Sequence, residues 1–419
     1  MKHRFIIIGM DDNRSPFFPP EALAQIRKGK VFSGGIRHKE IVGPLLPAGA
    51  EWISITVPLD HVFSHYEEIF TRFEETATDN SIIVFASGDP LFFGFANTIK
   101  RKLPEADILL YPAFNSLQTL AHRLVMPYDD MRTVSLTGRP WQEFDRALIE
   151  HAPKIGILTD REHTPTTIAA RMLKYGYSHY TLYIGEHLGN PEKERIRRMT
   201  PREAVAGDFE HPNCLLLDSH PGQCRTNSLH GSEAPDFPVR PFGIPDEEFA
   251  HLDGRARMIT KAPIRLLTLQ ALELNRRRVF WDIGFCTGSV SIEAKLQFPH
   301  LHVVAFEQRP EGERLMEINA TRFGTPGIIT RIGDFLQAEL DDLPVPDAVF
   351  IGGYGGKMKE VLIKVKNVLS HSGCIVFNSV SETSKDSFFS ITRELGMTTE
   401  ILHTITVDGN NPITIMRAI

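Results

Sequence analysis

Short apolar runs rich in β-branched residues alternate along most of the chain with longer segments whose apolar residues recur at helical spacing. In the N-terminal half, the runs that predict buried strands are Phe5–Ile8, Trp52–Val57, Ser81–Ala86, Ile108–Tyr111, Ile155–Leu158, Tyr180–Ile184 and Cys214–Leu217. The segments that predict helices are Glu21–Arg27, Phe63–Thr76, Phe93–Lys102, Ser116–Leu124 and Thr164–Lys174. Such alternation predicts an α/β fold with a largely parallel sheet.

The alternation stops between Asp218 and Pro245, where Ser, Pro, Gly and His dominate without either period, which is typical of a linker. It resumes as Arg265–Leu274, Val279–Ile283, Ser289–Leu296, Val303–Phe306, Gly312–Phe323, Ile328–Ile332, Ala348–Ile351, Met358–Leu369 and Cys374–Asn378. Thr398–Val407 and Pro412–Ala418 then predict two strands at an antiparallel edge. The sequence therefore predicts domains at 1–217 and 246–419, joined by a linker at 218–245.

Composition narrows the class of protein. Lys and Arg total 46 against 52 Asp and Glu, a formal charge of -6, so there is no basic excess to bind nucleic acid. The apolar runs are far shorter than the roughly 18 residues of a membrane span, and a cytoplasmic protein is expected. Four cysteines without CxxC spacing and 17 scattered histidines indicate neither disulfides nor a metal site.

The strongest local signal is the segment WDIGFCTGSVSIE, Trp281–Glu293. A strand ends at Asp282-Ile283, a glycine-containing turn follows, and a helix begins near Ser289, an arrangement that points backbone N–H groups at a ligand. Glu307 ends the next strand, where a carboxylate can accept hydrogen bonds from a ribose diol. Gly333-Asp334 and IGGYGG, Ile351–Gly356, end two further strands, and all these ends meet at one crevice of a doubly wound sheet.

Nicotinamide cofactors and S-adenosylmethionine both occupy such a crevice. The GxGxxG fingerprint admits a pyrophosphate, but its second and third positions are here Cys286 and Ser289. S-adenosylmethionine has no pyrophosphate, so the spacing favours a methyltransferase. A nicotinamide-dependent oxidoreductase is the alternative.

An ordered set of motifs in the second half carries a resemblance. They are IPDEEF, MITKAPIR, WDIGFCTGSVSIE, AFEQRPE, RIGDF, PDAVFIGGYGG and IVFNSVSET. This half resembles the decarboxylating methyltransferase domain of cobalamin biosynthesis, a Rossmann-like doubly wound fold. The resemblance implies an S-adenosylmethionine site at Thr260, Gly284, Phe285, Cys286, Thr287, Gly288, Glu307, Asp334 and Phe335. Cys286 replaces the usual second glycine of the turn, and Phe335 replaces a usual alanine.

The first half offers ASGDPLFFG, Ala86–Gly94, a turn in which Asp89 can simply cap the following helix. Together with SGGIRHKE, YPAFNSLQTLAHRL, SLTGRP, ILTDREHTPTTIAARML and IGEHLGNPEKERI, it resembles the tetrapyrrole methyltransferase domain. That family has two α/β lobes with S-adenosylmethionine in the cleft between them. The resemblance implies cofactor contacts at Gly88, Asp89, Asn115, Ser116, Thr159 and Asp160. Gly9–Asn13 replaces the usual Gly-x-Gly-Pro-Gly.

The order of the two halves along the chain is similar to that in the bifunctional, decarboxylating precorrin methyltransferases. The resemblance implies one S-adenosylmethionine site per domain, methylation of a precorrin or cobalt-precorrin at positions 5 and 15, and decarboxylation of an acetate side chain. Its substrate carries many carboxylates, for which Arg37, His38, Lys39, Lys261, Arg265 and Lys357 are the candidate cations. Related domains form oligomers, so a homo-oligomer is expected. In the alternative interpretation only the C-terminal domain is catalytic, and the N-terminal domain is a binding or assembly platform.

Overall fold

The computed structural model describes residues 3–75, 81–219, 242–255, 258–407, 409 and 411–419. Contacts within the chain define two compact units. Unit 1 comprises Met1–Arg139, Pro153–Ala169 and Tyr180–Gly222, and unit 2 comprises Pro140–Ala152, Ala170–His179 and Gln223–Ile419. Most of the predicted linker, 218–245, lies outside the described residues. Across the described ranges, no helix has both the length and the apolar character that a membrane span requires.

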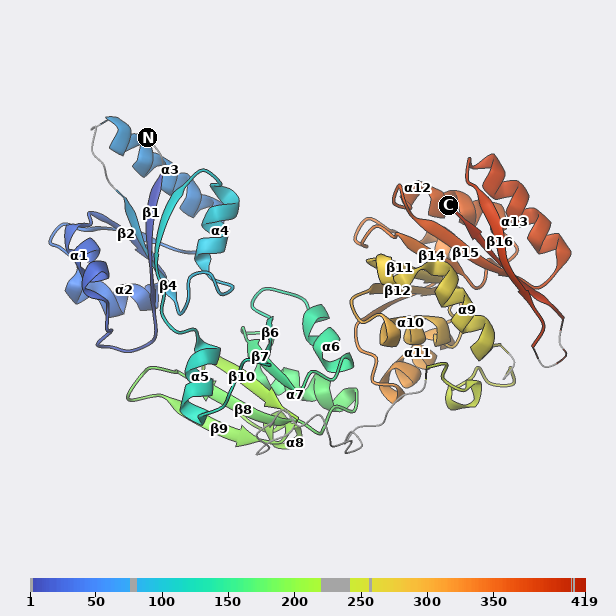
Figure 1. The fold of residues 1–419 in the computed structure, drawn as a ribbon, viewed down its shortest axis with the longest axis horizontal. Coiled ribbons are helices and arrows are strands. Elements are labelled where there is room, and N and C mark those ends of the chain that lie inside the picture. The colour runs from blue at the N-terminus through green and yellow to red at the C-terminus, as the bar shows by residue number, and fades with distance from the viewer. Residues whose placement is uncertain (1–2, 76–80, 220–241, 256–257, 408, 410) are drawn as a thin grey trace. The chain divides into compact units, whose positions relative to one another are not determined.

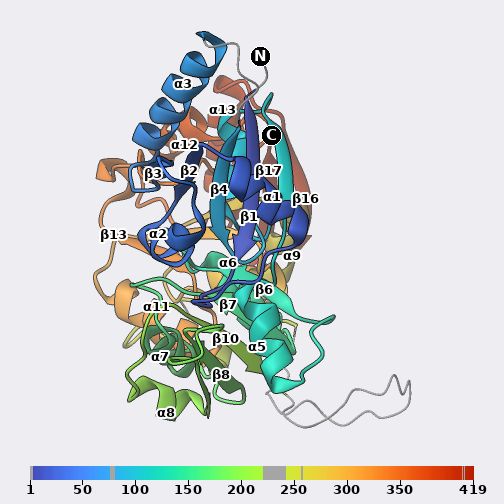
Figure 2. The ribbon, with the colours of Figure 1, turned by 90° about the vertical axis from the view of Figure 1, so that its left-hand side faces the viewer.

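The first sheet of unit 1 is wholly parallel, as the sequence predicts, with the order β3-β2-β4-β1-β5. Its strands are β1 (Arg4–Met10), β2 (Val31–Gly34), β3 (Glu51–Ser54), β4 (Ile82–Ser87) and β5 (Asp107–Tyr111). Alternate residues of the central strands pack on opposite faces. Helices α1 (Pro20–Lys28) and α2 (Ile36–Val42) cover one face, and α3 (Leu59–Glu75) and α4 (Phe95–Lys102) cover the other (Figure 1). Figure 2 shows these strands side by side.

The second sheet of unit 1 corrects the expectation of largely parallel strands. Its order is β6-β7-β10-β8-β9, and only β6 and β7 are parallel. The strands are β6 (Arg132–Ser135), β7 (Lys154–Leu158), β8 (Thr181–Glu186), β9 (Arg195–Met199) and β10 (Asn213–Asp218). Helices α5 (Ser116–Leu124) and α8 (Pro201–Val205) belong to unit 1, α6 (Gln142–Ile149) belongs to unit 2, and α7 (Pro165–Lys174) is divided between the two units. An apolar run marks a buried strand but carries no sign of its direction. Charged β9 lies at the sheet edge, so it lacks the apolar run that predicts a strand.

The sheet of unit 2 has the predicted parallel strands and antiparallel edge, and its strand order is β13-β12-β11-β14-β15-β17-β16. Its strands are β11 (Val279–Ile283), β12 (His302–Glu307), β13 (Ile328–Ile332), β14 (Ala348–Ile351), β15 (Cys374–Ser379), β16 (Thr399–Ile405) and β17 (Ile413–Ala418). Helices α9 (Ala262–Leu272), α10 (Ser289–Gln297) and α11 (Glu311–Arg322) cover one face (Figure 1). Helices α12 (Met358–Val368) and α13 (Glu382–Glu394), the latter not predicted, cover the other.

Candidate active sites

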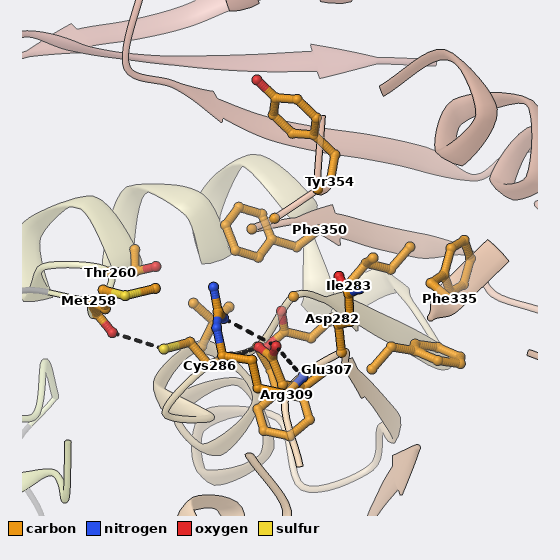
Figure 3. A pocket seen from close by; sticks show the side chains of 18 of the residues that line it. Met258, Thr260, Asp282, Ile283, Cys286, Glu307, Arg309, Phe335, Phe350 and Tyr354 are labelled. Carbon is orange, nitrogen blue, oxygen red and sulfur yellow. Dashed lines mark hydrogen bonds and ion pairs between the residues drawn. The ribbon is translucent and has the colours of Figure 1, made fainter. Parts of the chain in front are cut away.

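A pocket of about 700 Å³ lies in unit 2 at the carboxyl ends of β11, β12, β14 and β15, where the sequence places the cofactor crevice. We call it the unit 2 pocket. The predicted residues among those that line it are Thr260, Gly284, Phe285, Cys286, Glu307, Asp334, Phe335, Lys261 and Lys357. Figure 3 shows Thr260, Cys286 and Glu307 near one another, with Phe350 and Tyr354 contributed by β14 and the loop after it. Segments far apart in the sequence therefore meet here.

The turn after β11 has its backbone in the left-handed region at three positions, with φ of 79° at Gly284, 52° at Cys286 and 76° at Gly288. A Cβ on Gly284 would lie 2.6 Å from the backbone nitrogen of Gly353, so only glycine allows this close approach of two loops. The Cys286 thiol donates to the Met258 carbonyl at 3.1 Å, and burial, followed by the charge of Glu307, raises its pKa. The thiol therefore fixes the turn against the segment before α9.

Glu307 anchors the same turn from β12. Its side chain is 3% exposed, and one carboxylate oxygen accepts from the Cys286 amide at 2.8 Å. The other oxygen accepts from the Arg309 amide at 3.0 Å and from its guanidinium at 3.1 Å (Figure 3). The predicted ribose-binding carboxylate is thus held rigidly at the pocket wall.

Asp282 lines the unit 2 pocket, although the sequence analysis identified it only as the end of a strand. It is fully buried, and one carboxylate oxygen accepts from Ser291 Oγ at 2.6 Å, while the other has no hydrogen-bond partner within the described part of the chain. Burial raises the pKa of Asp282 to about 7. A cationic group bound beside the unpaired oxygen would favour the ionised carboxylate. The signal for this residue was an acidic side chain inside an apolar strand.

Arg265, a predicted substrate cation, is fully buried and does not line the unit 2 pocket. It pairs with Glu293 at 2.6 Å and Asp246 at 3.1 Å, and it donates to the carbonyls of Ile244 and Thr260. Arg265 therefore fixes the segment before α9 to α10. Of the cofactor residues, Thr287 and Gly288 also lie behind the pocket wall: Thr287 is 1% exposed, and Gly288 precedes α10 as its N-cap.

Two predicted residues on the far side of the unit 2 pocket interact with each other. Asp334 accepts from the Leu336 amide and pairs with Lys357 at 3.4 Å, and these contacts lower its pKa.

Phe335 is largely buried against Phe306, with ring centroids 5.0 Å apart. The large side chain at the usual alanine position thus forms part of the core beneath the pocket.

Unit 1 contains a second pocket, of about 510 Å³, which we call the unit 1 pocket. The predicted residues that line it are Gly88, Asn115, Ser116, Thr159, Arg37 and His38. Gly88 follows β4 with φ 62°, and a Cβ there would lie 2.9 Å from the Asn115 Cα, which again requires glycine. Asn115 caps α5 by accepting from the Gln118 amide at 2.9 Å.

Three predicted residues of unit 1 do not line the pocket but stabilise the segments around it. Asp89 accepts from the Leu91 amide at 2.8 Å inside the turn. It does not cap the following helix, as its position suggested, because α4 begins at Phe95 with Gly94 as its N-cap. Asp160 accepts from the amides of Gly138, Glu162 and His163. Burial opposes its ionisation, but these amides and the His163 ring together lower the pKa of Asp160 to about 2. The Lys39 ammonium lies 5.9 Å from the Trp52 ring.

Ser87 is a pocket residue that the sequence analysis missed, and two predicted cations orient it. Burial, then the charge of Arg37, lowers the pKa of His38 to about 4 against an opposing effect of Asp12, so the ring is neutral at pH 7. His38 Nδ1 accepts from the Gly35 amide, so Nε2 carries the proton and donates to Ser87 Oγ at 3.0 Å. Arg37 donates to the same oxygen. The Ser87 hydroxyl proton is therefore free to point into the pocket.

Comparison with known proteins covers both units. The family model for "Tetrapyrrole (Corrin/Porphyrin) Methylases" matches residues 18–205, and the model for "Precorrin methyltransferase domain" matches residues 248–418. A precorrin-6Y C(5,15)-methyltransferase [decarboxylating] from Sinorhizobium sp is 31% identical over 376 residues, covering 90% of this chain and 84% of the relative.

Two shorter Salmonella typhimurium proteins are also similar. A cobalt-precorrin-6B C(15)-methyltransferase (decarboxylating) is 37% identical over 142 residues, covering 34% of this chain and 71% of that protein. A cobalt-precorrin-7 C(5)-methyltransferase is 28% identical over 212 residues, covering 51% of this chain and 98% of that protein. The two activities joined in the Sinorhizobium relative's name thus also occur as separate proteins.

Proposed function

Because the chain belongs to the family of decarboxylating precorrin-6Y C(5,15)-methyltransferases, we propose that each of its two pockets binds one S-adenosylmethionine and supports one of two methyl transfers. The protein is an S-adenosylmethionine-dependent C-methyltransferase of cobalamin biosynthesis that methylates a precorrin and removes carbon dioxide from it. The observation that supports two sites is the presence of a separate pocket in each unit, with glycine turns at the strand ends of both.

The names of the two shorter relatives suggest which domain catalyses which reaction. We assign methylation at position 15 and decarboxylation to the domain at 246–419, and methylation at position 5 to the domain at 1–217. In support, the C(5) relative and the C(15) decarboxylating relative are independent proteins. Their names place C(15) methylation on cobalt-precorrin-6B and C(5) methylation on cobalt-precorrin-7, so we propose that the C-terminal domain acts first.

The residues of the unit 2 pocket fit S-adenosylmethionine. Glu307 is positioned for the ribose diol, and the unpaired oxygen of buried Asp282 suits a cationic group of the ligand. Small residues in the turn at 284–288 permit close approach of the ligand to the backbone. The sulfonium supplies a methyl group already activated for displacement.

Methyl displacement requires no protein nucleophile, so the chain mainly positions the reactants and excludes water. Correct positioning lowers a barrier by about 7–11 kcal/mol at best. In the unit 2 pocket, Lys261 and Lys357 provide positive charge for the substrate's carboxylates, Lys261 beside Asp246 and Lys357 beside Asp334. The conjugated macrocycle itself accepts the electron pair that decarboxylation releases.

The test is the mass of the product formed from S-adenosylmethionine and the precorrin substrate, with and without cobalt. We expect a gain of two methyl groups and the loss of one carbon dioxide. A gain of one methyl group together with carbon dioxide loss would instead support the alternative in which the N-terminal domain is a binding or assembly platform. The same reactions identify whether the substrate contains cobalt. Assembly into a homo-oligomer stays a prediction, which light scattering tests.

A further inference from the structure

The loop after β1 lacks the glycines of related domains and instead places two acidic side chains, Asp11 and Asp12, at the unit 1 pocket. Asp12 is 5% exposed, although it carries a carboxylate. Among the residues that the structure describes, Oδ1 has no hydrogen-bond partner, and it forms an ion pair with Arg37 Nε at 3.5 Å. An unsatisfied buried carboxylate oxygen is costly and rare in folded proteins. At the wall of a reaction pocket, it is a site for a proton or a hydrogen-bond donor of the bound substrate.

His187 connects this carboxylate to the protein surface. His187 follows β8 and has its backbone in the left-handed region, with φ 48°, a conformation that disfavours a non-glycine residue by about 1–2 kcal/mol. Its amide donates to the Pro212 carbonyl at 2.9 Å, which holds the backbone there. The ring places Nδ1 3.8 Å from Asp12 Oδ2 and Nε2 3.0 Å from Glu210 Oε2. Glu210 is 75% exposed on its side chain, so the three residues lead from the pocket to solvent.

The reaction of the unit 1 pocket releases a proton that needs such a route. A ring carbon of the macrocycle attacks the methyl group, the carbon–carbon bond forms, and the carbon–sulfur electron pair returns to sulfur to give S-adenosylhomocysteine. The macrocycle gains one positive charge, and loss of one proton restores its charge. Resting on the proposed function of this pocket, we propose that Asp12 accepts this proton and that His187 relays it to Glu210 and solvent.

The contacts around His187 fit the direction of transfer. With Nε2–H donating to Glu210, the Nδ1 lone pair faces Asp12 Oδ2. Rotation of the protonated Asp12 carboxyl group carries its O–H to this side, where Nδ1 accepts the proton while Nε2 passes its own to Glu210. The 3.8 Å separation is longer than a hydrogen bond, and the relay requires it to shorten in the catalytic complex, since catalytic hydrogen bonds are commonly long without ligand. The groups facing Asp12 are Arg37 and His38 from α2, with His187 and Asn190 from the segment between β8 and β9.

A structural role for Asp12 would leave a different signature. Asn190 Nδ2 donates to Asp12 Oδ2 at 3.4 Å, so Asp12 also links the loop after β1 to the segment after β8. Loss of that link would raise KM or lower the melting temperature. Loss of a proton acceptor lowers kcat and changes its pH profile, with KM and melting temperature preserved.

The experiment compares full-length wild type with Asp12→Asn, Glu210→Gln and, as a matched control, Glu192→Gln, which replaces an exposed glutamate outside the pocket lining. Products are resolved by mass, and carbon dioxide release by the C-terminal domain serves as the internal reference. We expect Asp12→Asn to lower kcat of the second methylation about 10²–10⁴-fold with KM little changed, so that the singly methylated, decarboxylated intermediate accumulates. Glu210→Gln should be slow in dilute buffer and recover as imidazole buffer is raised, because the buffer then takes up the proton.

The outcomes separate the relay from the proposed function. A wild type that adds only one methyl group would overturn the proposed function of the unit 1 pocket and the relay with it. A wild type that adds both, together with an Asp12→Asn variant within about threefold of its kcat across the pH range, would overturn the relay alone. An effect of Asp12→Asn confined to KM or to the melting temperature would assign Asp12 a structural role and also overturn the relay.

Discussion

Glu307→Ala tests the cofactor site of unit 2 most directly. The substitution removes a carboxylate that is 3% exposed and that accepts from the Cys286 amide, the Arg309 amide and the Arg309 guanidinium. It deprives the turn of the anchor for its strained position at Cys286, and it removes the acceptor proposed for the ribose diol. Hydrogen bonds to charged groups contribute about 1.5–3 kcal/mol each, but water replaces part of the loss in an open pocket. We therefore expect cofactor affinity to fall by about 1–3 kcal/mol, or roughly 5- to 150-fold.

Calorimetric titration of the full-length protein with S-adenosylhomocysteine measures this change without turnover. We expect wild type to bind two equivalents, one per pocket, and Glu307→Ala to weaken one of them while the other keeps its affinity. Glu307→Gln should give a smaller loss, since one amide oxygen can still accept from the Cys286 amide. Glu313→Gln, an exposed substitution on α11, serves as the matched control.

Two results would refute this reasoning. Unchanged affinity of both equivalents in Glu307→Ala, with an unchanged melting temperature, would remove Glu307 from the cofactor site. A single equivalent in wild type would contradict one site per pocket. If that remaining equivalent were insensitive to Glu307→Ala, the binding site would have to lie outside the unit 2 pocket.

Substitutions at three further residues, Arg265, Cys286 and His38, test stability and backbone strain. Arg265→Met should destabilise unit 2 by about 3–5 kcal/mol, because it leaves the buried Glu293 carboxylate without its ion-pair partner. Hydrogen exchange of the α9 and α10 amides measures this loss of stability. The double variant with Glu293→Gln should recover part of the lost stability. Cys286→Gly should retain cofactor binding, because glycine readily adopts the φ of 52° at this position. Cys286→Val places a β-branched side chain there, so it should lower the stability of the fold by about 1–2 kcal/mol and weaken cofactor binding in the same titration. The pKa of His38 is about 4 in the fold, against an ordinary value of 6.5 in the unfolded chain, so the unfolded chain binds more protons between these pH values. Stability should therefore fall as the pH drops from 6.5 toward 4, and His38→Gln should flatten this fall in melting temperature.

The strands that line both pockets were largely predictable from the sequence, and the reason is local. Buried parallel strands such as β1, β4 and β11 consist mainly of apolar residues, so the sequence shows where each strand ends. The glycine turns at Gly88 and Gly284 follow the ends of β4 and β11. The second sheet of unit 1 was less predictable. Its strand directions depend on how β8, β9 and β10 pair, and an apolar run is the same in either direction.

The charged residues show why site chemistry is harder to predict than strand position. In the sequence, Arg265 follows a cofactor motif and suggests a substrate cation, but the fold pairs it with Glu293, which lies 28 residues away, and buries both. His187 is one of 17 histidines in the sequence, and only the fold brings it within 3.8 Å of Asp12. Burial and partner choice are properties of the tertiary structure, and they decide whether a charge stabilises the fold or remains available for chemistry. By this criterion the loop at Gly9–Asn13, which departs from the usual glycine pattern, becomes functionally informative. It supplies a buried carboxylate at the pocket wall, and one oxygen of this carboxylate has no hydrogen-bond partner among the described residues.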